Sequence, residues 1–147
     1  MDYVKYIRSL VGNKKIIMTA GAVIIYNDKD EILLQHRGDD HFWGLPGGIM
    51  EIGEKPNETA IREAFEETGY NIEITDYLGD YHNFNKSWPG GDEAHIICFI
   101  YQGVIISGEM VIDGKETLDL KWFNMHDLPN IDAIDHVKAI SDYYNKK

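Results

Sequence analysis

Three glutamates, Glu63, Glu66 and Glu67, stand within five consecutive positions of the stretch REAFEETGY. Positions three and four residues apart share one face of an α-helix, so Glu63 would face both of the others. Like charges at these spacings destabilise a helix by a few tenths of a kcal/mol per pair, and the helix dipole disfavours anions near the C-terminal end. A divalent cation would reverse that balance, because clustered carboxylates are the ligands that Mg²⁺, Mn²⁺ and Ca²⁺ prefer. The spacing therefore indicates either a cation site or a solvated acidic face.

The helix that carries these glutamates is predicted over residues 56–68. Pro56 suits a first turn, and Gly69 suits the left-handed position just beyond a helix end. On a helical wheel, a separate face holds small and apolar residues, and we expect that face to pack on a sheet. Its members are Ala60, Ile61, Ala64, Phe65 and Thr68.

Runs of apolar and β-branched residues predict the elements around this helix. Strands are expected at residues 16–26, 31–37, 72–81, 94–106 and 118–123, and further helices at residues 2–10 and 132–144. We expect a turn at residues 27–30 to join the first two strands in a hairpin, and loops at residues 38–53 and 83–92. This order predicts an α+β fold with a mixed β-sheet between helices.

Length and charge limit the class of protein. The 147 residues fit a single domain, 1–147. A formal net charge of -11 argues against extended nucleic acid as a partner, since that needs a basic footprint, whereas a small anionic substrate needs only local cations. The N-terminus is too polar for a signal peptide and no segment is apolar enough to span a membrane, so a cytoplasmic protein without a membrane partner is expected.

Residues 47–70 read GGIMEIGEKPNETAIREAFEETGY and resemble the signature of the Nudix hydrolases. That signature is Gly, five residues, Glu, seven residues, Arg-Glu, an aliphatic residue, any residue, Glu-Glu, any residue, Gly and an aliphatic residue. All seven fixed positions match, at Gly48, Glu54, Arg62, Glu63, Glu66, Glu67 and Gly69. Ala64 and Tyr70 stand at the aliphatic positions, a departure that concerns packing rather than chemistry. The flanking segments WGLPGG and LKWFNMHDLP also look like the family's surroundings.

The resemblance implies an α/β/α sandwich, the Nudix fold. It also implies metal-dependent hydrolysis of a pyrophosphate bond in a nucleoside diphosphate linked to another group, with Mg²⁺ or Mn²⁺ as cofactor. By resemblance Glu63, Glu66 and Glu67 are metal ligands, and one of them could instead accept a proton from water.

Two further positions of the signature have implied roles at the same site. Arg62 would hold Glu63 in place, and Glu54 would reach the site directly or through a metal-bound water. A backbone carbonyl at Gly47 or Gly48 would be a further ligand, and we expect Gly69 to be structural.

Three residues outside the signature are weaker candidates. Glu116 precedes the last predicted strand, where some Nudix enzymes place a further catalytic or metal-binding glutamate. Arg37 could contact a phosphate or form an ion pair at a strand end. Trp88 could stack on a base or pack against its own loop. Cys98 is interpreted as a core residue, and the histidines lack the spacing of a zinc site.

The natural substrate is not encoded in the signature. A nucleoside triphosphate, ADP-ribose and a nucleotide sugar all fit as the small nucleotide substrate. The alternative is a non-catalytic Nudix-fold sensor that binds a nucleotide, although such proteins usually lose signature glutamates. A homodimer formed through the helix at residues 2–10 is a further expectation, but that helix could equally cover the sheet of its own chain.

Overall fold

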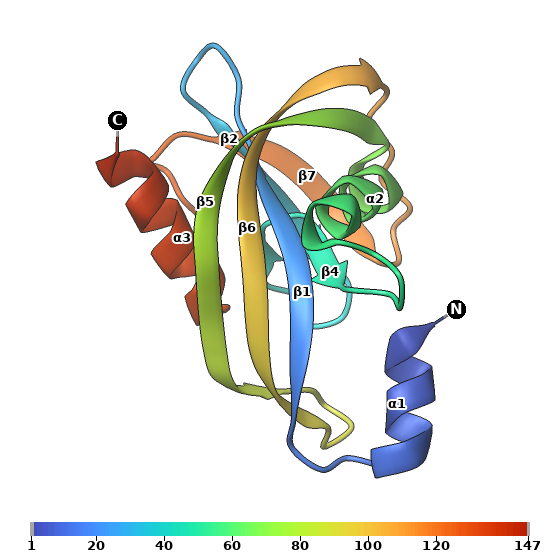
Figure 1. Ribbon diagram of the computed structural model, residues 1–147. Helices are drawn as coiled ribbons and strands as arrows, with labels where there is room; N and C mark the ends of the chain where they lie inside the picture. Colours follow the sequence, from blue (N-terminus) through green and yellow to red (C-terminus); the bar gives the residue numbers. More distant parts are fainter. Residues whose placement is uncertain (1, 147) are drawn as a thin grey trace.

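The computed structural model, which describes residues 2–146, has three helices and seven strands in that range (Figure 1). The helices are α1 (Tyr3–Val11), α2 (Pro56–Thr68) and α3 (Ile134–Asn145). The strands are β1 (Ile16–Ile25), β2 (Ile32–Arg37), β3 (Trp43–Gly44), β4 (Gly47–Ile49), β5 (Tyr70–Ser87), β6 (Glu93–Gly108) and β7 (Thr117–Phe123). A mixed sheet has the order β4-β1-β6-β5, and an antiparallel sheet has the order β3-β2-β7. The predicted α+β class is confirmed.

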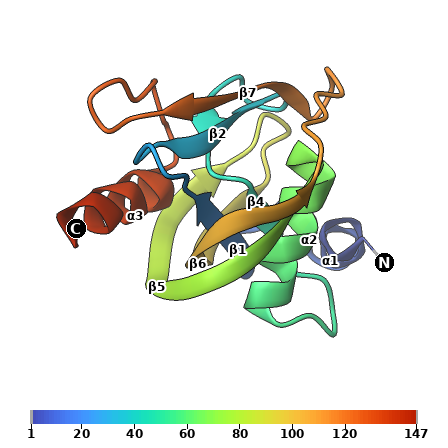
Figure 2. The ribbon, with the colours of Figure 1, turned by 90° about the horizontal axis from the view of Figure 1, so that it is seen from above.

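Strand β1 crosses the middle of the larger sheet, parallel to β6 and antiparallel to β4. Because alternate side chains of a strand point to opposite faces, β1 serves two cores. Ala22 and Ile24 pack in the core that includes residues of α3, whereas Val23 and Ile25 pack in the core that includes residues of α2. Figure 2 shows α2 and α3 on opposite sides of this sheet. Burial on both faces explains the unbroken apolar run of β1.

Helix α2 has the predicted bounds but presents a different face to the sheet. Ile61 is 36% exposed and Phe65 is 51% exposed, so the expectation that both pack on the sheet is wrong. The buried positions are Thr59, Ala60, Ala64, Glu67 and Thr68. Small residues set this orientation: a Cβ atom at Gly21 of β1 would come 2.4 Å from a backbone oxygen of α2. The close approach turns Glu67 inward, toward the sheet.

The first two strands do not form the predicted hairpin. β1 and β2 belong to different sheets, and between them only Tyr26 and Ile32 form an isolated bridge. The turn itself is present, since the side chain of Asn27 accepts hydrogen bonds from the N–H groups of Lys29 and Glu31. Instead, β1 pairs with β4 and β6, and β2 pairs with β3 and β7.

Two segments predicted as loops contain strands. β3 and β4 lie within residues 38–53, and β5 continues to Ser87, well into the predicted loop at residues 83–92. Pairing with β6 over its whole length, through several bulges, extends β5 beyond what its polar sequence favours. Across residues 2–146 no helix combines the length and the apolar character needed to cross a membrane.

Candidate active site

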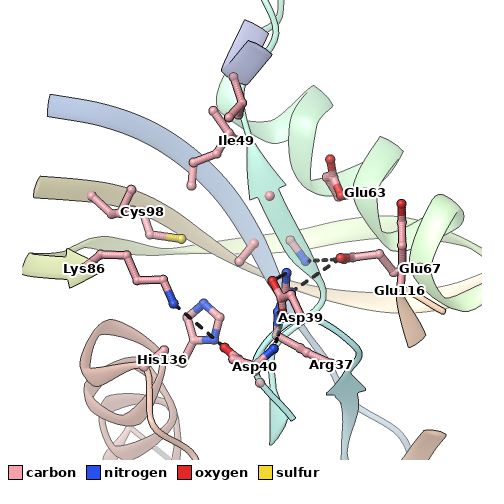
Figure 3. A pocket seen from close by; sticks show the side chains of 18 of the residues that line it. Arg37, Asp39, Asp40, Ile49, Glu63, Glu67, Lys86, Cys98, Glu116 and His136 are labelled. Carbon is pink, nitrogen blue, oxygen red and sulfur yellow. Dashed lines mark hydrogen bonds and ion pairs between the residues drawn. The ribbon is translucent and has the colours of Figure 1, made fainter. Parts of the chain in front are cut away.

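A cavity of about 920 Å³ is bounded by β4, one side of α2, the start of α3 and the segment before β7 (Figure 3). Most of the site residues predicted from the sequence line this cavity. Those on its lining are Arg37, Gly48, Arg62, Glu63, Glu66, Glu67, Trp88 and Glu116. Of the predicted site residues, all of which the structure describes, Glu54 alone lies outside the lining.

Glu67 is the most enclosed of the three glutamates, with 5% of its surface exposed. The backbone N–H of Gly47 donates to its Oε1 atom at 2.7 Å, and Arg37 Nη1 lies 3.5 Å from its Oε2 atom. Burial, together with the negative charge of Glu63, raises the pKa of Glu67 to about 8 against the opposing charge of Arg37. Burial is the largest cause of this rise, and a cation bound to the carboxylate would oppose it.

Gly48 allows the Glu63 carboxylate to lie directly against the backbone of β4. A Cβ atom at position 48 would come 2.5 Å from Glu63 Cδ and would displace the carboxylate. Burial raises the pKa of Glu63 as well. The glycine is therefore needed sterically, whatever ligand role its carbonyl has.

Arg62 connects three of the predicted glutamates through one guanidinium group. Its Nε and Nη2 atoms donate to Glu54 at 2.6 and 3.0 Å, and its Nη1 atom donates to Glu63 at 2.9 Å and to Glu66 at 3.1 Å. The hydrogen bonds from Arg62 lower the pKa of Glu54 to about 2. Glu54 thus orients Arg62 from outside the cavity, and its role as a metal ligand stays a prediction.

Arg37 ends β2 beside a buried polar network. Its Nε and Nη2 atoms each donate to Asp39 at 3.1 Å, so the predicted strand-end ion pair is present. The neighbouring Gln35 is fully buried and donates to the hydroxyl of Thr117, which in turn donates to the backbone oxygen of Glu67 at 2.8 Å. These contacts fix the C-terminal turn of α2 against β2 and β7. Contact of Arg37 with a phosphate stays a prediction.

The two remaining candidates lie at different places on the cavity wall. Glu116 is exposed and stands beside Glu67 (Figure 3), at the end of the segment before β7. Trp88 is half-buried against the core on the α3 side, and Lys86 Nζ lies 5.4 Å from the centre of its ring. Trp88 therefore contacts the core and a residue of β5, and its stacking on a base stays a prediction.

A second polar group lines the cavity away from the glutamates. Cys98, Asp135 and His136 each have one potential ligand atom within 4.8 Å of the other two. Sequence reasoning treated Cys98 as a core residue and did not single out the other two. No spacing pattern connects them, because they come from β6 and from the first turn of α3. The available signal was an acidic residue followed by histidine at the start of a predicted helix.

The glutamate wall fits a divalent cation by the chemistry of its donors. Glu63, Glu66 and Glu67 bring carboxylate oxygens to one side of the cavity, where Arg37 and Arg62 contact them. Hard cations prefer such oxygen ligands. These three side chains, with the adjacent backbone of Gly47 and Gly48, are the groups that would hold the ion.

Comparison with known proteins identifies the fold and the family. A family model described as NUDIX domain matches residues 16–143. The "Putative 8-oxo-dGTP diphosphatase" of Bacillus subtilis (strain 168) is 38% identical over 128 residues, which cover 86% of this chain and 80% of that protein. The ADP-ribose pyrophosphatase of Methanocaldococcus jannaschii is 34% identical over 126 residues, covering 84% of this chain and 71% of that protein.

Solved structures agree on the fold. A crystal structure of a UDP-X diphosphatase superposes with a TM-score of 0.74 at 21% identity, over 99% of this chain and 72% of that chain. The NUDIX domain of Shewanella oneidensis NrtR, crystallised with ADP ribose, has a TM-score of 0.61 at 21% identity, over 99% of both chains. With the family model matching most of its length, the chain belongs to the Nudix hydrolases, which act on phosphorus-containing anhydrides.

Proposed function

We propose that this chain hydrolyses a pyrophosphate bond in a nucleoside diphosphate linked to another group, with Mg²⁺ or Mn²⁺ held by Glu63, Glu66 and Glu67. The observation that carries the proposal is the cluster of three signature glutamates on the lining of a cavity of nucleotide size. A volume of about 920 Å³ lies within the range of small-molecule sites. Nudix hydrolases generally depend on a divalent metal, which agrees with the donor set.

The residues of the glutamate wall would have different roles in hydrolysis. A bound divalent cation neutralises charge on the pyrophosphate oxygens and lowers the pKa of bound water. Arg62 orients Glu63 and Glu66 through its hydrogen bonds, and Glu54 keeps Arg62 in place. Arg37 faces the same wall from β2, and we expect it to contact a phosphate. A carboxylate oxygen of this wall, or of Glu116 beside it, accepts the proton of the attacking water.

The relatives differ in the group attached to the diphosphate. One is named for 8-oxo-dGTP and another for ADP-ribose, while the solved neighbours include a UDP-X diphosphatase. The glutamate wall handles only the phosphates and the metal, so it is compatible with a nucleoside triphosphate, ADP-ribose or a nucleotide sugar. The rest of the cavity must select among them.

A substrate panel tests the proposed function. Nucleoside triphosphates, ADP-ribose and nucleotide sugars would be incubated with and without Mg²⁺ or Mn²⁺, and the products separated by anion-exchange chromatography. We expect metal-dependent cleavage of the pyrophosphate bond, lost in Glu67→Gln and kept in the matched control Glu73→Gln, whose side chain is exposed on β5. Tight binding of a nucleotide without turnover of any panel member would favour the sensor instead.

Two predictions about assembly belong with this proposal. We propose that residues 1–147 act as one Nudix domain, and that two copies pair as a homodimer. Sedimentation velocity at several protein concentrations measures the second directly, and a monomer at all of them would contradict it.

A further inference from the structure

Helix α1 lies outside the part of the chain that the family model matches. The match begins at residue 16, whereas α1 spans Tyr3–Val11. Its apolar side packs against the core of its own chain through Tyr3, Val4 and Ile7, which are all half-buried. Val4 and the capping residue Asp2 also line the cavity of the active site. An element from outside the matched range therefore forms part of the cavity wall.

Two sets of contacts fix the position of α1. Toward its C-terminal end the side chain of Arg8, which is 11% exposed, donates to the backbone oxygens of Lys14 at 2.7 Å and of Glu93 at 2.8 Å. At its N-terminal end the backbone N–H of Tyr3 donates to both carboxylate oxygens of Glu51, at 2.9 and 3.2 Å. Figure 1 shows this end of α1 beside the loop that precedes α2. Because both ends are held, the helix has a defined position relative to that loop.

The contact between Tyr3 and Glu51 continues to Arg62 through a turn of the chain. The backbone N–H of Glu51 donates to Glu54 Oε1 at 2.9 Å, and the backbone N–H of Glu54 donates to the carbonyl oxygen of Glu51 at 3.1 Å. The carboxylate of Glu54 in turn accepts two hydrogen bonds from Arg62. Hydrogen bonds therefore connect the first residue of α1 to the guanidinium group that contacts the glutamate wall.

We propose that α1 is a functional part of the active site, in which the N–H group of Tyr3 positions Glu51 and, through Glu51 and Glu54, the guanidinium of Arg62. Tyr3 and Glu51 are positioning residues, since they act on the cation site through other side chains. This inference rests on the proposed function only in taking the glutamate wall as the cation site. Groups that orient metal ligands commonly contribute a factor of about 10 to 100 to metal affinity.

Two other roles for these residues lead to different expectations. If α1 only covered the core, loss of the Tyr3 hydrogen bond would lower stability and leave the affinity for a cation unchanged. If Glu51 were itself a ligand of the cation, its negative charge would be needed and the N–H group of Tyr3 would not. Removal of the donor and removal of the acceptor distinguish these roles from the positioning role.

The first test removes the donor from the N-terminus of α1. Tyr3 is the first residue of the helix, a position that tolerates proline, and the extended backbone of Asp2 suits a residue before proline. Tyr3→Pro lacks the N–H group, whereas the matched control Tyr3→Ala keeps it, and the aromatic ring is absent from both variants. We expect Mn²⁺ to bind Tyr3→Pro about tenfold more weakly than Tyr3→Ala.

Titration with Mn²⁺ followed by electron paramagnetic resonance measures both dissociation constants without a substrate. Thermal unfolding of the two variants reports any difference in stability separately. Equal Mn²⁺ affinities of Tyr3→Pro and Tyr3→Ala would overturn the inference, even if their Tm values differed, because α1 would then only cover the core.

The second test changes the acceptor. Glu51→Gln keeps an oxygen that can accept from Tyr3, whereas Glu51→Ala removes both oxygens. We expect Glu51→Gln to bind Mn²⁺ within about threefold of the wild type and Glu51→Ala to bind it about tenfold more weakly. The matched control Glu73→Ala removes an exposed glutamate of β5. An equal loss in Glu51→Gln and Glu51→Ala would identify the charge of Glu51 as the cause and would overturn the positioning role.

The third test follows Arg62 without metal or substrate. Its Nε–H group, which donates to Glu54 at 2.6 Å, gives a resonance of its own in an NMR spectrum. We expect this resonance to differ between Tyr3→Pro and Tyr3→Ala, while the Nε–H resonance of Arg37, which donates to Asp39, stays in place. The measurement separates the two proposals, since it applies even to a chain that binds no cation and hydrolyses nothing on the panel. An identical Arg62 resonance in the two variants would overturn the inference.

Discussion

The two ends of the cavity are built in different ways. The glutamate wall places Glu63, Glu66 and Glu67 on one helix and ties two of them to Arg62, a residue of the same helix. The far wall combines Cys98 of β6 with Asp135 and His136 of α3, and Leu45 of a connecting segment sets the tautomer of His136. The residues of the glutamate wall lie close together in the sequence, whereas those of the far wall come from separate elements.

The difference separates a general task from a selective one. Binding a cation and a diphosphate needs several carboxylates close together, which helical spacing alone can arrange. Discriminating among the groups attached to the diphosphate needs a particular pattern of donors and acceptors, and the far wall offers such groups from α3, β6 and the segment around Leu45. The comparison therefore predicts that changes at the first wall affect every substrate alike, whereas changes at the second affect their ranking.

The largest expected effect is at the glutamate wall. In Glu63→Gln one charge of the cation site is removed, and we expect kcat/KM to fall about 10³-fold for every substrate, because charge stabilisation by the cation is worth several kcal/mol. Steady-state rates on the substrate panel measure it. A loss of kcat/KM confined to one substrate would show that the glutamate wall also discriminates among substrates.

A smaller loss is expected from the backbone beneath Glu63. In Gly48→Ala the added Cβ would lie 2.5 Å from Glu63 Cδ and push the carboxylate away, so kcat should fall about 10- to 100-fold without a change in substrate preference. Gly90→Ala is the matched control, since a Cβ atom there meets no atom within 4 Å. Equal rates in the two variants would show that the position of Glu63 is not critical.

The pH dependence of stability reports on the buried charge of Glu67. Its pKa is raised from 4.5 to about 8, so the folded protein holds this proton more tightly than the unfolded chain. Without metal, the free energy of unfolding should therefore fall as pH rises through that window. Glu54, with a pKa lowered to about 2, contributes stability that is lost only in stronger acid, below its ordinary value of 4.5.

Calorimetry of the metal-free protein checks this expectation. Between about pH 5 and about pH 8 the Tm of the wild type should decline, and Glu67→Gln should flatten the decline. Saturating Mg²⁺ should oppose it, since the cation favours the ionised carboxylate. Parallel curves of Tm against pH for wild type and variant in the absence of metal would show that the pKa of Glu67 is not raised in the folded protein.

The smallest expected effect concerns how α3 is held. The hydroxyl of Tyr81 on β5 donates to Asp142 Oδ2 at 2.8 Å, and Tyr81→Phe removes that bond. We expect a loss of about 1 kcal/mol in the free energy of unfolding, measured by urea denaturation. The rate on the preferred substrate should hardly change. A large change in the ranking of substrates would show that α3 depends on this single contact for its position.

Particular residues show how far sequence reasoning reached. The bounds of α2 and the inclusion of seven signature residues in one region were predictable, because Pro56, Gly69 and the glutamate spacing are local signals. Exposure of Ile61 and Phe65 was not, since the small residues of α2 and Gly21 of β1 decide which face of the helix approaches the sheet. The pairing of β1 with β6 instead of β2 is equally a matter of long-range contact.

By itself, the sequence determined the family, the α+β class and the acidic stripe, because each follows from residues close together in the chain. Only the tertiary structure decided that Glu67 is buried, that Glu54 binds Arg62 from outside the cavity lining, and that Cys98, Asp135 and His136 come together. The physical reason is that burial and hydrogen bonding depend on which segments, far apart in the sequence, come into contact. A local sequence pattern does not predict those contacts.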